Sequence, residues 1–164
     1  MRAFSIPALL IIMAAVPVKS ASAQDMDAPS QAVLDTVQRF FDALESKDGD
    51  ALRSVLTTQG ITHALRIRGD SVVVVARPHD AAVASITGSD ASLMERMFDP
   101  VVHVDDHLAV VWTPYDFHVN GTFSHCGTDI FSLIRVRDAW KIASITYTVE
   151  QDDCPERPPL ENSP

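Results

Sequence analysis

The chain has 164 residues, 46% of them hydrophobic, and a formal net charge of −9 from 13 basic and 22 acidic side chains. This length and apolar content suffice for one domain with a core of its own. The acidic balance argues against nucleic acids and anionic membrane surfaces as partners, because both repel a negatively charged protein.

The N-terminus has the pattern of a secretory signal peptide, which we place at residues 1–23. A short basic start precedes an almost wholly apolar stretch at 3–18, and Ala21 and Ala23 provide the small residues of a cleavage site. We expect cleavage after Ala23, export to the periplasm or the medium, and no membrane association afterwards. The alternative is a retained membrane anchor, although the apolar stretch is shorter than the roughly 20 residues of a bilayer span.

The mature chain would keep 141 residues, with 11 basic and 22 acidic side chains. We expect a flexible N-terminus at 24–29 and a single domain over 30–154. Four of the ten residues at 155–164 are proline, which predicts a disordered tail.

Two cysteines, Cys126 and Cys154, remain in the mature chain. In an oxidising compartment such a pair is expected to form a disulfide, and closing this loop would stabilise the fold by roughly 3 kcal/mol. The alternatives are two unpaired thiols or a catalytic Cys126. For the catalytic alternative the nearest partner, His125, is expected on the opposite face of the strand.

The first half of the domain is predicted to start with helices. Apolar residues recur at spacings of three and four over 33–44, which predicts an amphipathic helix from about Ser30 that ends near Gly49. A second, short helix is expected from Asp50, with Gly60 as its end.

Two short strands, 61–67 and 71–76, are then predicted around a turn at Gly69-Asp70. Residues 79–98 are expected to form two helical pieces. The apolar side of the second piece is made by Leu93, Met94, Met97 and Phe98. Strands at 101–104 and 140–149 are expected to flank a long central hairpin.

The hairpin is predicted from Asn120-Gly121, which lies between two runs of alternating apolar and polar residues. A type I′ turn needs positive φ at both central residues, and Asn-Gly is the pair that best allows it. Counting back from the turn predicts that Asp116 faces His125 and that Trp112 faces Asp129. A bulge near Pro114, which cannot donate to a ladder, would shift the register beyond that point.

Helices that come first and strands that cluster late predict an α+β fold. We expect a curved, cone-shaped antiparallel sheet with the N-terminal helices packed on its concave face.

Three stretches resemble the nuclear transport factor 2-like superfamily, in particular its SnoaL-like and lumazine-binding bacterial members. They are the helix with paired aromatics Phe40 and Phe41, the segment ESKDGDALRSVL, and the segment DIFSLIRVRDAWKIASITYT. The block WTPYDFHVNGTFSHCGTD resembles a subset of exported members, and the resemblance covers 30–149. It implies a cone-shaped barrel with an open pocket and, often, a homodimer. The superfamily includes ketosteroid isomerases, dehydratases and polyketide cyclases as well as members without known activity, so the fold alone does not assign a function.

Alternation along the predicted hairpin decides which side chains face the pocket. The inward set is Leu108, Val110, Trp112, Asp116, His118, Phe123, His125, Asp129, Phe131 and Leu133. The outward set is Tyr115, Phe117, Ser124, Cys126 and Thr128. We expect Trp112, His118, Phe123 and Phe131 to form the pocket wall together with Phe98 and Phe41.

Asp116, His125 and Asp129 are the candidate catalytic residues. A carboxylate beside an imidazole raises the pKa of the imidazole and orients it, so Asp116 and His125 would form a general acid/base pair. Asp129, enclosed by Trp112 and Phe131, would have a raised pKa and donate a hydrogen bond while neutral. The alternative is structural: a cross-strand Asp116–His125 pair and a buried Asp129 bonded to the backbone or to a hydroxyl.

The histidines show no spacing typical of metal ligands, and the chain has no phosphate-binding loop or zinc motif. We therefore predict neither a metal nor a cofactor. Three functions remain open. The first is an exported module that binds a small apolar or aromatic molecule. The second is a cofactor-free dehydratase, isomerase or cyclase that uses the three candidate residues. The third is a domain with a filled core whose outer sheet face binds a partner or a second copy.

Overall fold

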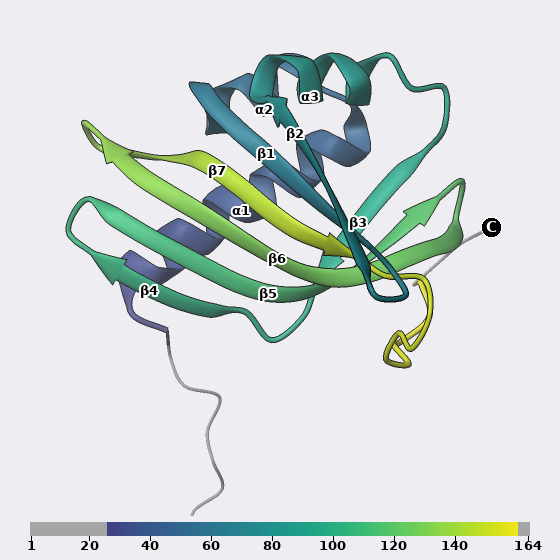
Figure 1. Ribbon diagram of the computed structural model, residues 1–164. Helices are drawn as coiled ribbons and strands as arrows, with labels where there is room; N and C mark the ends of the chain where they lie inside the picture. Colours follow the sequence, from purple (N-terminus) through teal and green to yellow (C-terminus); the bar gives the residue numbers. More distant parts are fainter. Residues whose placement is uncertain (1–25, 161–164) are drawn as a thin grey trace, which may run out of the picture.

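The computed structural model describes residues 26–160, so the predicted signal peptide lies outside the described residues (Figure 1). The elements in chain order are α1 (Ala28–Ser46), α2 (Gly49–Val55), β1 (Leu56–Arg68), β2 (Ser71–Pro78), α3 (His79–Thr87), β3 (Leu93–Met97), β4 (Val101–Asp105), β5 (Leu108–Val119), β6 (Thr122–Val136) and β7 (Ala139–Val149). Within the described part, no helix combines the length and the apolar character that a membrane crossing requires.

All seven strands form one curved sheet in the order β2-β1-β7-β6-β5-β3, with β4 also paired to β5. Every pairing is antiparallel except β1 with β7. Figure 1 shows α1 crossing behind the sheet while α2 and α3 lie at one end of it. The expected α+β architecture, with helices on the concave face of a mostly antiparallel sheet, is confirmed.

Helix α1 provides most of the apolar layer that covers the sheet. Its start is capped by Asp27, whose side chain accepts a hydrogen bond from the backbone N–H of Ser30 at 3.0 Å. Phe40 and Phe41 project from the buried face, and each ring packs edge to face against Phe131 of β6 at 5.7–6.0 Å between centroids. This contact joins the helix to the middle of the sheet.

The expected second helix is shorter than predicted, because Gly60 lies inside strand β1 and does not end a helix. The reason is a close contact across the fold. A Cβ atom at this glycine would lie 2.0 Å from the ring of His79, the first residue of α3. The ring is almost fully buried, and its Nδ1 is 3.1 Å from the carbonyl oxygen of Thr57. Only glycine lets β1 pass beneath this imidazole.

The second helical piece predicted within 79–98 is wrong: residues 93–97 form strand β3. They pair in antiparallel register with β5, from Leu93 opposite Val119 to Met97 opposite Tyr115. Leucine, methionine, glutamate and arginine all favour helix, but pairing with a neighbouring strand overrides that weak preference. The alternation then places Glu95 on the concave side together with Leu93 and Met97.

The predicted hairpin turn is confirmed, since Asn120 and Gly121 both have positive φ, at 52° and 72°. The first two pairs, Val119 with Thr122 and His118 with Phe123, follow the expected register. The ladder then slips by one residue, with Ser124 as the extra residue of a bulge. Pro114 lies in a regular part of the ladder, so the bulge is nearer the turn than predicted.

The bulge makes both predicted cross-strand pairs wrong. Asp116 faces Cys126 instead of His125, and Asp129 faces Thr113 instead of Trp112. A shift of one residue turns every side chain of one strand to the other face relative to its partner. The sequence analysis therefore predicted the wrong set of pocket-facing side chains for β5, whereas most of its set for β6 is right.

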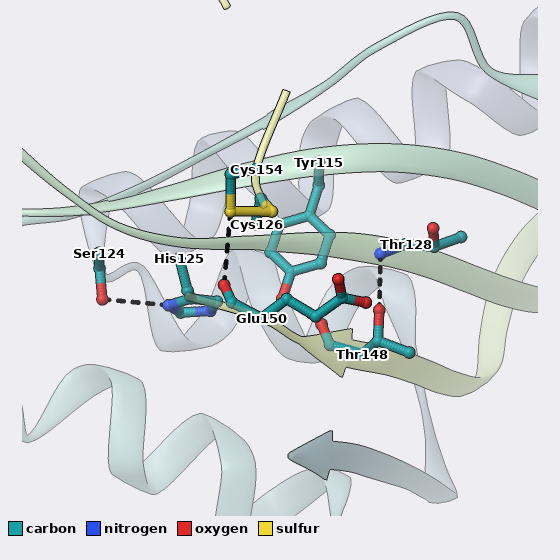
Figure 2. The surroundings of a disulfide bond; sticks show 8 residues. All are labelled: Tyr115, Ser124, His125, Cys126, Thr128, Thr148, Glu150 and Cys154. Carbon is teal, nitrogen blue, oxygen red and sulfur yellow. Dashed lines mark hydrogen bonds between the residues drawn. A yellow bond between two sulfur atoms is a disulfide. The ribbon is translucent and has the colours of Figure 1, made fainter. Parts of the chain in front are cut away.

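The disulfide between Cys126 and Cys154 is present, as predicted. Figure 2 shows how it connects β6 to the chain that leaves β7, where Cys126 and Glu150 also exchange two backbone hydrogen bonds. Beyond it, residues 155–160 contain no helix or strand. Arg157 stacks on the ring of Phe98 at 4.2 Å from its centroid.

Candidate functional site

A cavity of about 250 Å³ lies between the concave face of the sheet and helices α1 and α3. Its apolar wall comes from helices and strands alike: Phe40, Leu44, Leu56, Ile86, Leu93, Phe117, Phe131 and Ile145. Its polar and titratable side chains are Thr62, Arg77, Ser85, Glu95, Tyr115, His125, Asp129 and Tyr147. Apolar walls with a few convergent polar groups are typical of a small-molecule site.

Three of the residues predicted for the site, His125, Asp129 and Phe131, line this cavity. Phe41 does not reach it, because its ring is buried behind Phe131 in the core. Tyr115 and Phe117, which were expected to face away, line the cavity because of the bulge.

The other predicted residues lie outside the cavity. Trp112 and Phe123 are on the outer face of the sheet and are 43% and 45% exposed, so their placement in the pocket wall is wrong. His118 and Asp116 share that outer face. Phe98 follows β3 and lies beside Arg157, not in the pocket wall.

Asp116 forms an ion pair on the outer face in place of the predicted acid/base pair. The guanidinium of Arg96 donates two hydrogen bonds to its carboxylate, at 2.9 and 2.5 Å. This bond raises the pKa of Arg96. The Nε2 atom of His118 lies 3.4 Å from the same carboxylate. Asp116 is 1% exposed, so a paired arginine is what makes its burial tolerable.

Two carboxyl groups meet inside the cavity, Asp129 from β6 and Glu95 from β3. Burial raises the pKa of Asp129 well above its usual value, and the neighbouring charge and hydrogen bond of Glu95 raise it further. Burial raises the pKa of Glu95 to about 7, against the lowering effect of its hydrogen bond with Asp129. Both carboxyl groups are therefore harder to ionise than ordinary acids, and at neutral pH Glu95 is close to half ionised.

The Asp129 carboxyl has one buried oxygen, Oδ2, without a hydrogen-bond partner among the described residues. An unsatisfied buried carboxyl oxygen is costly, and such atoms in native structures often mark a functional site. The predicted raised pKa of Asp129 is confirmed in direction. The residues that surround it are Glu95 and Tyr115 instead of Trp112.

Tyr115 is fixed beside the pair by a hydrogen bond that its hydroxyl donates to the carbonyl oxygen of Thr148 at 2.7 Å. Burial, and then the charges of Asp129 and Glu95, raise its pKa far above the usual range, so it stays neutral. The ring lies over Gly127, where an added Cβ would be 2.8 Å from the ring and 2.1 Å from the Thr148 carbonyl. Glycine at this position lets the tyrosine lie flat against β6.

His125 is held neutral at one end of the cavity. Its ring stacks on Phe117 at 4.9 Å between centroids, and its Nδ1 is 3.0 Å from the hydroxyl of Ser124 (Figure 2). Burial lowers its pKa, and the positive charge of Arg66 lowers it further. The ring therefore acts as a hydrogen-bonding wall residue with no carboxylate to activate it.

Glu95 and Tyr147 are two titratable cavity residues that the sequence analysis did not consider for the site. Glu95 was hidden because its segment was expected to be a helix. Tyr147 lies opposite Asp129 in the β6–β7 ladder, and the alternation of the last strand provides the signal that would have placed it on the concave side. Over residues 26–160, no three His, Cys, Asp or Glu side chains come together as a ligand set for a metal ion.

Solved structures share this architecture at low sequence identity, which supports the fold alone. A protein of unknown function with a cystatin-like fold from Nostoc punctiforme has a TM-score of 0.61 at 7% identity, covering 77% of this chain and 96% of that one. A nuclear transport factor 2-like protein from Cytophaga hutchinsonii has a TM-score of 0.61 at 13% identity, covering 76% and 99%. A putative dehydratase of the same fold family from Streptomyces avermitilis has a TM-score of 0.58 at 17% identity, covering 75% and 96%.

A search of curated proteins returned no match to this sequence. The family described as putative lumazine-binding matches residues 28–148, from the first residue of α1 almost to the end of β7. With a fold of the nuclear transport factor 2-like type and a family match over most of its length, the chain belongs to the putative lumazine-binding family.

Proposed function

We propose that this domain binds a small, largely apolar or aromatic molecule in the cavity beneath the sheet, with Glu95 and Asp129 as its polar anchor. The observation that carries the proposal is the pair of carboxyl groups, both with raised pKa values, that meet in a cavity with largely apolar walls. A filled core would gain nothing from two acids whose ionisation is suppressed by burial.

The chemistry of the pair suggests which ligand groups it would accept. When the two carboxyls share one proton, their remaining oxygens are acceptors, and Oδ2 of Asp129 is already without a protein donor among the described residues. A ligand N–H or O–H group would satisfy it. The cavity of about 250 Å³ is small for a drug-sized ligand, so one or two fused rings are the size that fits.

The family name points to lumazine, pteridine-2,4-dione, as the first compound to test. It is a planar two-ring molecule with N–H groups that can donate to carboxyl oxygens. Stacking between the rings of Phe117 and Phe131 would hold its faces, since both side chains line the cavity.

The test is an equilibrium titration of the protein with lumazine, followed by the fluorescence of the compound. Ala82→Phe places a large ring in the cavity and should weaken binding at least tenfold, because Ala82 lines it. Ala84→Phe is the matched control on the exposed side of the same helix and should leave the Kd within about twofold. Glu95→Gln should weaken binding about tenfold or more, the usual value of a hydrogen bond to a charged group. Equal binding by Ala82→Phe and the wild type would contradict the proposal.

A second candidate function is cofactor-free acid/base catalysis, as in an isomerase, dehydratase or cyclase. It is favoured by one observation, the pKa of about 7 for Glu95, since a general base works best when its pKa is near the working pH. In this candidate Glu95 removes the proton, Asp129 and His125 contact the substrate, and Asp116 has no part. The test is proton exchange at the acidic C–H of the bicyclic ketone α-tetralone in heavy water, followed by NMR. Wild-type protein should speed the exchange and Glu95→Gln should not; no acceleration by wild type would exclude this candidate for such ketones.

Export is also part of the proposal. The leader pattern supports it, and so does the disulfide, because such bonds persist in oxidising compartments. Mass spectrometry of the protein recovered from a secreting host should give a chain that starts at Gln24. A protein recovered with residues 1–23 attached would contradict it.

Homodimer formation is the remaining proposal about partners. It is supported by apolar side chains that are neighbours on the outer face of β4, β5 and β6, where Val101, Trp112 and Ile130 are 45%, 43% and 39% exposed. A dimer should be seen by light scattering, and Trp112→Arg should convert it to a monomer. A monomeric wild type would contradict this part.

A further inference from the structure

A second hollow, of about 570 Å³, adjoins the first cavity at the far end of the concave face. Phe117, His125 and Tyr147 line both spaces, so the two spaces share these three side chains as a common border. The other walls of the second hollow come from the end of β1 with its turn to β2, from the β5–β6 hairpin, and from the end of β7 with the chain after it. The β1–β2 turn and the chain after β7 lie at the same end of the sheet in Figure 1.

The two spaces differ in their chemistry. The walls of the first are mostly apolar and include one arginine, Arg77, whereas two arginines, Arg66 and Arg68, line the second. Both arginines are exposed, and neither forms a salt bridge with any residue of the described part. Among the described residues, Asp152 is the one acid that lines this hollow. Two unpaired arginines in one hollow stand out in a chain with a formal net charge of −9.

The positions of the arginines on β1 make them suitable for one shared anion. They are two residues apart, so both lie on the concave side of the strand, with Cα atoms roughly 7 Å apart. Arg66 is close enough to this border that its charge adds to the lowering of the pKa of His125 by burial and opposes the burial that raises the pKa of Tyr147. Guanidinium groups in such a pair can each donate two hydrogen bonds to a carboxylate or phosphate.

Strand register gives the separation of the two polar regions. Ala64 lies opposite Tyr147, which lies opposite Asp129, and Arg66 is two residues further along β1. Standard strand spacings then place the backbone of Arg66 about 12 Å from that of Asp129. A ring system with a short flexible chain would reach from one region to the other.

We propose that the natural ligand is elongated, with a ring system in the first cavity and an acidic group held by Arg66 and Arg68 in the second hollow. This inference rests on the proposed function, because it extends the ligand of the same cavity. In this proposal Arg66 and Arg68 make the protein prefer anionic ligands over neutral ones, and the carboxyl pair binds the ring system.

The test compares indole with indole-3-butyrate by isothermal titration calorimetry. Both carry the ring N–H that the carboxyl pair would accept, and only the second has an acidic group on a flexible chain. Wild-type protein should bind indole-3-butyrate at least about tenfold more tightly than indole, and the difference should shrink as salt is added. The double variant Arg66→Gln/Arg68→Gln should lose that preference while its affinity for indole changes less than about twofold.

Arg135→Gln is the matched control, since Arg135 is an exposed strand arginine that lines neither space. It should keep the preference for indole-3-butyrate. Indole and indole-3-butyrate binding equally well to wild type, or the double variant keeping the preference, would overturn the inference and leave the proposed function standing. Failure of both probes to bind would overturn the inference, whereas the proposed function is decided separately by the lumazine titration.

Discussion

Replacing Glu95 with glutamine should change how the stability of the protein depends on pH. The pKa of Glu95 in the folded protein is about 7, above the ordinary glutamate value of 4.5. As the pH rises above 4.5, the carboxyl ionises in the unfolded chain while the folded protein still holds the proton. The free energy of unfolding therefore falls from about pH 4.5 to about pH 7 and is then constant. A glutamine side chain cannot ionise, so the variant should lack this fall.

The size of the effect follows from the pKa. For each pH unit over which the folded protein binds one proton more than the unfolded chain, the free energy of unfolding falls by about 1.4 kcal/mol. The raised pKa of Glu95 therefore lowers the free energy of unfolding by about 3 kcal/mol across this range. Asp129, whose pKa is raised mainly by burial, adds a fall of its own in both proteins, and only the part of its shift that Glu95 causes is absent from the variant. His79 and His125 have lowered pKa values and act in the opposite direction below pH 6.5, but they are present in both proteins and cancel in the difference.

Urea unfolding at pH 5 and pH 8 measures this difference. We expect the free energy of unfolding of Glu95→Gln, relative to wild type, to increase by about 2.5 kcal/mol between the two pH values, because part of the fall in wild type has already occurred at pH 5. Glu45→Gln removes an exposed carboxyl from α1 and is the control, for which we expect little change. A difference between Glu95→Gln and wild type that is the same at both pH values would refute the reasoning, because Glu95 would then ionise as it does in the unfolded chain.

Three further substitutions test other parts of the fold. Gly60→Ala should lower the free energy of unfolding by about 1–3 kcal/mol in urea, because its Cβ would overlap the buried ring of His79; an unchanged value would mean that the ring moves aside freely. Replacing Cys126 and Cys154 together by serine should cost about 3 kcal/mol relative to the disulfide-bonded wild type by the loop-entropy model, and reduced wild type is the control that should match the variant. Phe131→Ala should cost about 3–5 kcal/mol, since the ring is 1% exposed, and a thermal shift of less than about 3 °C would argue that it does not join α1 to the sheet.

Much of the architecture could be predicted because local signals and long-range packing agree there. The Asn120-Gly121 turn depends only on backbone conformation at two residues, and the periodicity of α1 depends only on which face is buried. The disulfide between Cys126 and Cys154 followed from the compartment implied by the leader.

The faces of the hairpin could not be predicted, since a bulge at Ser124 needs no special residue. One unpaired residue left His125 and Asp129 on the expected side and moved Asp116 to the outer face. The acid/base pair predicted from the sequence was therefore wrong, although two of the three candidate residues line the cavity.

Glu95, the second acid of the site, was missed for a different reason. Residues 93–97 contain good helix formers, and nothing local marks them as a strand. These residues adopt an extended conformation because they pair with the edge of β5, and that edge exists only in the assembled sheet. A site built from strands distant in sequence is visible only once the sheet is formed.

The most direct test of the cavity as a ligand site is an NMR map of the backbone amides during titration with lumazine. The account predicts that the largest shifts lie on the concave side, at Glu95, Asp129 and Tyr147, with small shifts at Trp112 and Phe123 on the outer face. Shifts confined to Trp112 and Phe123 would contradict it, because the ligand would then bind the opposite side of the sheet from the carboxyl pair.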